Sequence, residues 1–162
     1  MSQPASFVFH AASPEGTTLL AEKLAGFLCH PGDCVLLRGE LGVGKTAFAR
    51  AFIQASCEAP GEVTSPTFTL LNPYTRKDGS ALLHADLYRL ETLEEALNIG
   101  IEEMLPQSVS LIEWPEIIRP LWSARAVLVE GEFDLASEAR RWRLQPVAEA
   151  PAGWAEFLEG LR

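Results

Sequence analysis

Residues 39–46 form a complete phosphate-binding loop, and this motif constrains the fold more than any other part of the chain. It has the pattern G-x-x-x-x-G-K-T and reads Gly39-Glu40-Leu41-Gly42-Val43-Gly44-Lys45-Thr46. An apolar run, 34–37, precedes the loop, and a helix-forming run, 46–56, follows it. A strand, a glycine-rich turn and a helix in this order are the context in which the motif binds phosphate. The sequence therefore predicts an α/β fold with a nucleotide site at this loop.

Each part of the loop has a chemical role in binding phosphate. Glycines let the backbone curl so that its N–H groups face inward, and the following helix adds partial positive charge at its N-terminus. Lys45 can reach the β- and γ-phosphates, and the hydroxyl of Thr46 can ligate Mg²⁺. The loop is thus expected to hold the phosphates of a nucleotide together with one magnesium ion.

Chain length and net charge limit the number of domains and the classes of partner. The 162 residues predict a single domain, 1–162, that is long enough to bury a core. Thirteen basic and twenty-two acidic residues give a net charge of −9, which disfavours tight, direct binding of nucleic acid. The one basic cluster is Arg140, Arg141 and Arg143, and strand alternation would divide it between two faces. We expect that cluster to be a solvated edge.

The cysteines and the lengths of the apolar runs indicate in which cellular compartment the protein resides. Cys29, Cys34 and Cys57 form no C-x-x-C pair, which favours reduced and mostly buried thiols. The first ten residues lack the pattern of a secretory signal, and no apolar run reaches the roughly 18 residues of a membrane span. The sequence predicts a cytoplasmic protein without a membrane partner.

Strand-like and helix-like segments alternate along most of the chain. The predicted strands are 7–10, 34–37, 67–71, 81–84, 108–112, 126–130 and 141–144. One helix is predicted to begin near residue 14, and four further helices are predicted over 46–56, 92–105, 115–122 and 152–161. This alternation predicts a P-loop NTPase-like α/β sandwich with a mostly parallel central sheet and antiparallel additions toward the C-terminus. Its ligand should lie at the carboxyl ends of the strands.

Two acidic residues stand where such strands end. Asp86 follows the run 82–85, and Glu113 follows the run 109–112. Phosphoryl transfer needs Mg²⁺ held by the loop hydroxyl and usually by an acid at a strand end. Each carboxylate could instead be a solvated loop acid or a helix cap, but two of them beside an intact loop favour a role at the phosphates.

A hydroxyl-rich segment and a histidine are further candidates. Residues 65–69, Ser-Pro-Thr-Phe-Thr, lie between the loop helix and Asp86, where nucleotide switches place a segment that responds to the γ-phosphate. Thr67 is the hydroxyl we would choose, although an ordinary strand that starts at a proline is equally consistent. His84 could transfer protons, but a satisfied core or edge histidine is the more frequent case.

Four motifs in this order resemble the TsaE (YjeE) family of bacterial ATPases. They are 39–46, 65–70 (Ser-Pro-Thr-Phe-Thr-Leu), 84–90 (His-Ala-Asp-Leu-Tyr-Arg-Leu) and 111–116 (Leu-Ile-Glu-Trp-Pro-Glu). The first motif is generic, whereas the combination with the other three is specific. The resemblance covers residues 10–120 well and the last forty residues only loosely.

The resemblance implies a cytoplasmic ATPase that supports the synthesis of threonylcarbamoyladenosine in tRNA. Such an ATPase acts on a complex of the TsaD transferase with its partner TsaB, and it meets tRNA only indirectly. The implied cofactors are ATP and Mg²⁺.

The resemblance also implies roles for residues of this chain. Carried over, Lys45 would hold the phosphates, Thr46 with Glu113 would hold Mg²⁺, and Asp86 would serve hydrolysis. Thr17, with Thr18 beside it as the other possibility, would lie near the nucleotide. The family usually has threonine where this chain has Ala47, so a backbone contact to the α-phosphate remains and a hydroxyl contact is lost.

Two other classes of protein share the loop. A small-molecule kinase would need an acceptor pocket and usually a basic lid, and the sequence has no arginine-rich lid segment. A nucleotide-switched interaction module would bind ATP without hydrolysing it, and the sequence does not separate it from a slow ATPase. A GTPase is disfavoured because no Asn-Lys-x-Asp motif occurs.

Overall fold

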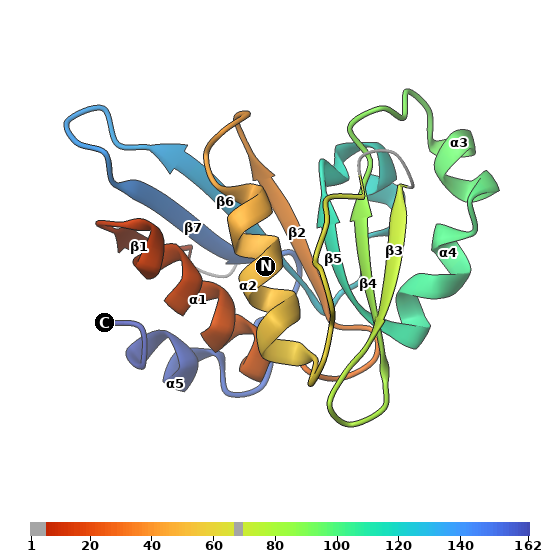
Figure 1. Cartoon of the computed structure of the whole chain (residues 1–162), viewed down its shortest axis with the longest axis horizontal. Coiled ribbons are helices and arrows are strands. Elements are labelled where there is room, and N and C mark those ends of the chain that lie inside the picture. Colours follow the sequence, from red (N-terminus) through yellow and green to blue (C-terminus); the bar gives the residue numbers. More distant parts are fainter. Residues whose placement is uncertain (1–5, 67–69) are drawn as a thin grey trace.

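A single mixed sheet organises the computed structural model, which describes residues 6–66 and 70–162. In the described residues the sheet has seven strands, in the order β1-β7-β6-β2-β5-β4-β3 across the sheet (Figure 1). In chain order the strands are β1 (Phe7–Ala11), β2 (Cys34–Gly39), β3 (Leu71–Thr75), β4 (Ala81–Asp86), β5 (Ser108–Glu113), β6 (Ala126–Phe133) and β7 (Arg140–Pro146).

Strand direction agrees with the prediction in the centre of the sheet and differs at its edges. Strands β6, β2, β5 and β4 run parallel to one another. Strands β7 and β1 are antiparallel additions on one side, and β3 is an antiparallel addition on the other. A mostly parallel sheet is therefore right only for the four central strands. The antiparallel β3 follows from the short turn Lys77–Ser80, because so short a connection can join only antiparallel strands.

Helices cover both faces of this sheet. One face carries α1 (Pro14–Phe27), α2 (Lys45–Ser56) and α5 (Trp154–Glu159), and α1 and α2 lie in front of the strands in Figure 1. The other face carries α3 (Leu93–Asn98), α4 (Ile101–Met104) and the 3₁₀ helix η2 (Pro115–Leu121), with the short η1 (Leu105–Gln107) leading into β5.

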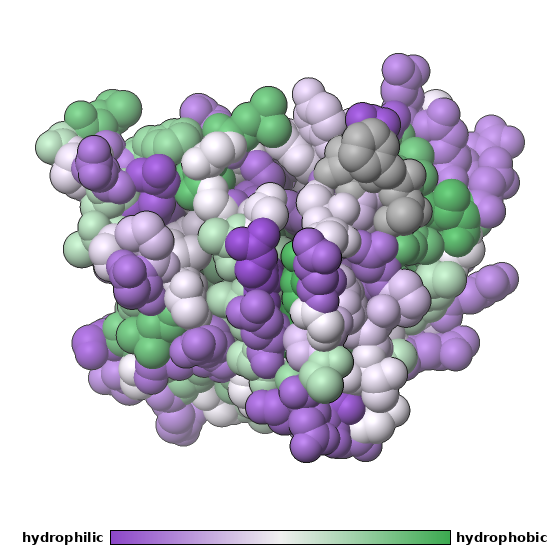
Figure 2. Space-filling view, in the orientation of Figure 1, coloured by the Kyte–Doolittle hydropathy of each residue, from purple (hydrophilic) through white to green (hydrophobic). Residues whose placement is uncertain are grey.

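The side chains of β2 show how the sequence builds these layers. Val35 and Leu37 join the core beneath α1 and α2, whereas Cys34 and Leu36 join the core on the other face. Successive side chains of a strand point to opposite faces, so a strand covered on both sides must be apolar throughout. On the outside, hydrophilic residues occupy much of the face that carries α1 and α2, and apolar residues form separate groups there (Figure 2).

Two predicted elements were wrong. The helix predicted over 92–105 divides into α3, α4 and η1, because Gly100 adopts a left-handed backbone with φ of 82° between the first two. The strand predicted over 67–71 begins at Leu71 and continues through Asn72 and Pro73, while 67–69 lie outside the described residues. Proline is tolerated there because β3 is an edge strand.

The remaining sequence expectations concern thiols and membranes. All three cysteines are free, and Cys34 and Cys57 are buried, as expected. Within 6–66 and 70–162, no helix has both the length and the apolar character that crossing a membrane requires.

Candidate functional site

The phosphate-binding loop connects the end of β2 to the start of α2. Gly39 and Gly44, at its two ends, have φ values of 143° and 116°, which side chains rarely adopt. A β-carbon at position 39 would also lie 2.6 Å from the carbonyl oxygen of Gly131 on β6. Glycine at position 39 is therefore required by the close approach of a neighbouring strand as well as by the turn.

Lys45 is buried at the centre of this loop. Its Nζ donates hydrogen bonds to the carbonyl oxygens of Gly39 at 2.6 Å and Glu40 at 3.0 Å, and it lies 4.4 Å from the ring centroid of Trp114. Burial lowers the pKa of Lys45, and the nearby carboxylates of Glu113 and Asp86 oppose that shift. The ammonium is thus largely removed from water, and its hydrogen bonds among the described residues go to loop carbonyls, which phosphate oxygens could replace.

Strand register brings the two acids to the same edge of the sheet as the loop. Asp86 of β4 is the register partner of Glu113 of β5, and Glu113 is also the partner of Leu37 of β2. Backbone bonds continue this alignment beyond the strands, because the N–H of Trp114 donates to the carbonyl of Leu37 and that of Leu87 donates to the carbonyl of Glu113. Carboxyl ends of parallel strands meet at one edge, where ligands of such sheets bind.

These residues surround a hollow of about 550 Å³, which we call the loop-side hollow. Its lining comprises Leu41, Gly42, Gly44, Lys45, Thr46, Ala47, Arg50, Ser65, Asp86, Tyr88, Glu113 and Trp114. Most of the predicted phosphate-binding residues are among them. Gly39, Glu40 and Val43 are not: the first two offer their carbonyls to Lys45, and the side chain of Val43 is buried in the core.

Thr17 is placed differently from the other predicted nucleotide contacts. It is buried in α1 and does not line the loop-side hollow. Its Oγ1 accepts a hydrogen bond of 2.9 Å from Nε1 of Trp142 on β7. A nucleotide contact by Thr17 stays a prediction, and in this structure its hydroxyl serves the core.

Glu113 is oriented by a histidine that belongs to the neighbouring strand. Nε2 of His84 lies 2.8 Å from Oε2 of Glu113, and both side chains are buried. Nδ1 of His84 has no hydrogen-bond partner among the described residues. His84 is therefore a buried partner of Glu113 with one unpartnered ring nitrogen, and a role in proton transfer stays a prediction.

Asp86 is held close to the same position. Its Oδ1 accepts a hydrogen bond of 3.0 Å from the backbone N–H of Tyr88. Burial raises the pKa of Asp86, and the charge of Glu113 raises it further. A buried carboxylate beside a second acid forms a place where positive charge is favoured.

The residues present fit a magnesium ion that arrives with phosphates. The hydroxyl of Thr46 and the carboxylate of Glu113 both line the loop-side hollow. Over the described ranges, no group of three or more His, Cys, Asp and Glu side chains could hold a metal by itself. Mg²⁺ commonly takes one or two protein ligands and completes its shell with water and substrate phosphates, and this donor set suits that mode.

Some features of the site were not found from the sequence. Trp114 has a left-handed backbone with φ of 56°, and its ring centroid lies 4.9 Å from that of Tyr88. The only sequence signal was Pro115, because a residue before proline is biased away from the helical region. Ser65 lines the hollow, whereas Thr67 lies outside the described residues.

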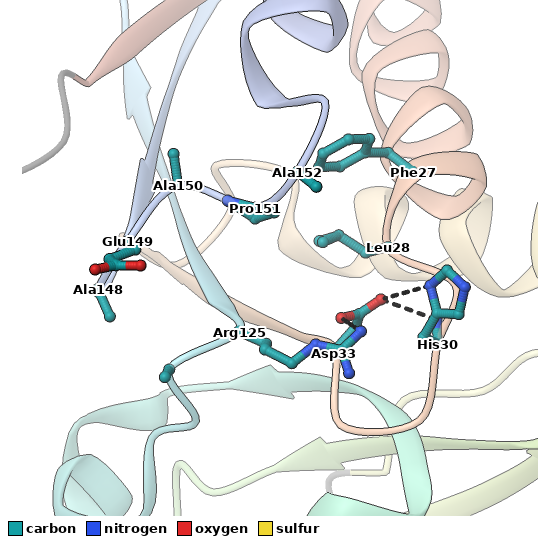
Figure 3. A pocket seen from close by; sticks show the side chains of 11 residues that line it. Phe27, Leu28, His30, Asp33, Arg125, Ala148, Glu149, Ala150, Pro151 and Ala152 are labelled. Carbon is teal, nitrogen blue, oxygen red and sulfur yellow. Dashed lines mark hydrogen bonds and ion pairs between the residues drawn. The ribbon is translucent and has the colours of Figure 1, made fainter.

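A second hollow, of about 590 Å³, lies near the amino-terminal ends of the central strands β2 and β6, and Figure 3 shows the residues that line it. We call it the basal hollow; it is lined by Phe27, Leu28, His30, Asp33, Ala124, Arg125, Ala148, Glu149, Ala150, Pro151 and Ala152. Asp33 and Arg125 directly precede β2 and β6, whereas the phosphate-binding loop follows β2. The two hollows therefore lie at opposite ends of the central strands.

Comparison with known proteins gives consistent matches. A family model described as "Threonylcarbamoyl adenosine biosynthesis protein TsaE" matches residues 11–142. A "tRNA threonylcarbamoyladenosine biosynthesis protein TsaE" of Rickettsia felis is 42% identical over 127 residues, covering 78% of this chain and 72% of that protein. The protein of the same description from Bacillus subtilis is 38% identical over 112 residues, covering 68% of this chain and 67% of its own length. The crystal structure of Bacillus subtilis YdiB is similar over 99% of this chain and 97% of that one, with a TM-score of 0.73 and 25% identity.

Proposed function

This chain belongs to the TsaE family of threonylcarbamoyladenosine biosynthesis proteins, and from that premise we propose that it is a Mg²⁺-dependent ATPase. We further propose that it assists the TsaD transferase and its partner TsaB in the modification of tRNA. One observation carries the ATPase proposal: Lys45, Thr46, Asp86 and Glu113 line a single hollow although they come from three different elements.

Nucleotide binding rests on the loop. The N-terminus of α2 and the loop amides present partial positive charge, and Lys45 adds a full charge that is already largely removed from water. An ammonium in that environment attracts a phosphate more strongly than one in bulk solvent. In place of the hydroxyl that the family usually has, Ala47 offers its backbone N–H to the α-phosphate.

Hydrolysis rests on the two acids. A bound Mg²⁺ would supply charge neutralisation at the phosphates, and Thr46 and Glu113 would hold it. His84 fixes the direction of the Glu113 carboxylate through the 2.8 Å contact. Asp86, whose raised pKa reflects a partly desolvated carboxylate, is the group that would orient or deprotonate the attacking water.

The accessory role rests on the family and on charge. The net charge of −9 disfavours a direct grip on the tRNA backbone, so contact with tRNA would pass through a partner. Hydrolysis that is slow alone and faster with a partner fits this arrangement, because a partner can supply or order stabilising charge at the phosphates.

An ATPase assay of the purified chain, alone and with the TsaB–TsaD pair, tests the proposal. We expect slow release of phosphate by the chain alone and stimulation by the pair. Transfer of phosphate to an added small-molecule acceptor would favour a kinase instead. ATP binding without any phosphate release, with or without the pair, would favour a non-hydrolysing switch.

A further inference from the structure

We propose that Arg140 is a positioning residue that sets the shape of the phosphate-binding loop by fixing the peptide between Val43 and Gly44. The proposal rests on nucleotide binding by that loop, and it assigns a role to a residue outside all four sequence motifs. The sequence placed Arg140 in a solvated basic edge, and its contacts overturn that expectation.

The guanidinium of Arg140 is held between the loop and the turn of the β6–β7 hairpin. Its Nε donates a hydrogen bond of 3.1 Å to the carbonyl oxygen of Val43. Its Nη1 donates one of 2.6 Å to the carbonyl of Glu138, and the guanidinium carbon lies 4.4 Å from the ring centroid of Phe133. Arg140 is therefore half-buried and fixed on the hairpin side, and one directional bond remains for the loop.

That bond determines which way the next amide points. A trans peptide is planar, so its C=O and N–H groups face opposite directions. The carbonyl of Val43 is turned toward Arg140, and the N–H of Gly44 must then point away from it. Gly44 lines the loop-side hollow, and inward-facing amides of such a loop are the groups that bind phosphate oxygens. Arg140 thus acts on the phosphate site through a peptide unit.

Packing of the rest of the β6–β7 hairpin fixes the position of Arg140 relative to the loop. Trp142, two residues further along β7, is fully buried and packs on Gly131 so closely that a β-carbon there would lie 2.6 Å from the indole. A β-carbon at Gly44 would lie 3.7 Å from the same indole. Val43 is only 1% exposed, so packing of its side chain in the core also anchors the loop backbone. The β6–β7 hairpin therefore supports the loop at several points, and Arg140 adds a side-chain hydrogen bond to the backbone of Val43.

The test compares three variants in the full-length chain. Arg140→Met keeps an apolar stem over Phe133 and removes every donor, whereas Arg140→Lys keeps the positive charge and an ammonium donor group. Arg143→Met is the matched control, because it removes the same charge from an exposed position on the opposite face of β7. Affinities for Mg-ATP and Mg-ADP are measured by calorimetry, and the Gly44 amide resonance is followed by NMR with and without nucleotide.

We expect Arg140→Met to weaken ATP and ADP by the same factor, roughly tenfold, as for the loss of a hydrogen bond from a charged donor. Arg140→Lys should recover part of that loss, and Arg143→Met should bind like the wild type. The Gly44 amide resonance should move in Arg140→Met even without nucleotide. If Arg140→Met does not fold, Arg140→Leu, which likewise has no donor, replaces it with the same expectations.

Two results would overturn the proposal. One is an Arg140→Met protein that matches the Arg143→Met control in affinity and in its Gly44 resonance. The other is a loss confined to ATP, which would mean that the guanidinium contacts the γ-phosphate directly. A wild-type chain that binds neither nucleotide would refute the proposed function alone, because the Gly44 resonance without nucleotide still decides the role of Arg140.

Discussion

The two hollows of this protein are similar in size and differ in the state of their polar groups. The basal hollow measures about 590 Å³ and the loop-side hollow about 550 Å³. They lie at opposite ends of the same central strands, so they share a scaffold and differ only in what the chain places at each end. Of the two, the basal hollow is slightly larger.

At the basal end the buried acid is already paired. Oδ2 of Asp33 accepts a hydrogen bond of 2.8 Å from the N–H of His30, and Oδ1 lies 2.7 Å from Nη2 of Arg125 (Figure 3). Much of the remaining lining is apolar, including Phe27 and Pro151. A carboxylate bound in this way closes a turn and has no unmet demand for a ligand.

At the loop end the polar groups are buried and only partly paired. Within the described residues, Nδ1 of His84 lacks a partner, Trp114 has a left-handed backbone, and the hydrogen bonds of Lys45 go to carbonyls of its own loop. Strain and unsatisfied polarity persist where function requires them. Unsatisfied polar groups, rather than cavity volume, therefore distinguish the proposed ligand site from the basal hollow.

Replacing the loop lysine should produce the largest difference between the two ends. Lys45→Ala should weaken ATP binding by roughly a thousandfold, because a desolvated ammonium that contacts phosphate is lost. Arg125→Ala, the matched loss of a cation at the basal hollow, should leave ATP affinity unchanged in the same calorimetric titration. Equal losses of ATP affinity in Lys45→Ala and Arg125→Ala would contradict the difference between the two hollows.

A second test separates binding from chemistry within the loop-side hollow. Asp86→Ala should keep ATP affinity within about threefold and slow single-turnover hydrolysis by roughly a hundredfold, the usual contribution of a general base. Glu94→Ala, which removes an exposed acid from α3, serves as the control. Loss of ATP affinity in Asp86→Ala as large as that in Lys45→Ala would contradict the division of roles.

A third, smaller effect should reveal the metal ligand. Glu113→Gln removes the charge while its amide oxygen can still accept a hydrogen bond from His84, so the buried histidine keeps its partner. We expect ATP binding in the presence of Mg²⁺ to weaken about tenfold, and binding without Mg²⁺ to stay unchanged. A magnesium titration that coincides with that of the wild type would exclude Glu113 as a ligand.

The smallest effect should come from the basal acid, and it should concern stability alone. Asp33→Ala leaves the N–H of His30 without its acceptor and Arg125 without its carboxylate. The free energy of unfolding should fall by about 1–2 kcal/mol in a urea titration, with ATP affinity unchanged. A clear change in ATP affinity would show that the two ends are coupled and that the basal hollow has a functional role.

The sequence predicted the positions of the candidate site residues better than it predicted the directions of the edge strands. The acids at 86 and 113 were found because each follows an apolar run, and that is a local pattern. The antiparallel edges were missed in part, since strand direction depends on which strands become neighbours. The helix over 92–105 was too long because periodicity continued through Gly100, whose left-handed conformation ends α3.

By itself, the sequence determined the phosphate-binding loop, because its glycines, its lysine and its flanking strand and helix are contiguous and act through local backbone geometry. Only the tertiary structure decided how distant groups are arranged around that loop. Register placed Asp86 beside Glu113 and His84 against it. The chain then brought Arg140 to Val43 across 97 residues. Such contacts depend on strand order and on packing between remote elements, and no local pattern of residues encodes either.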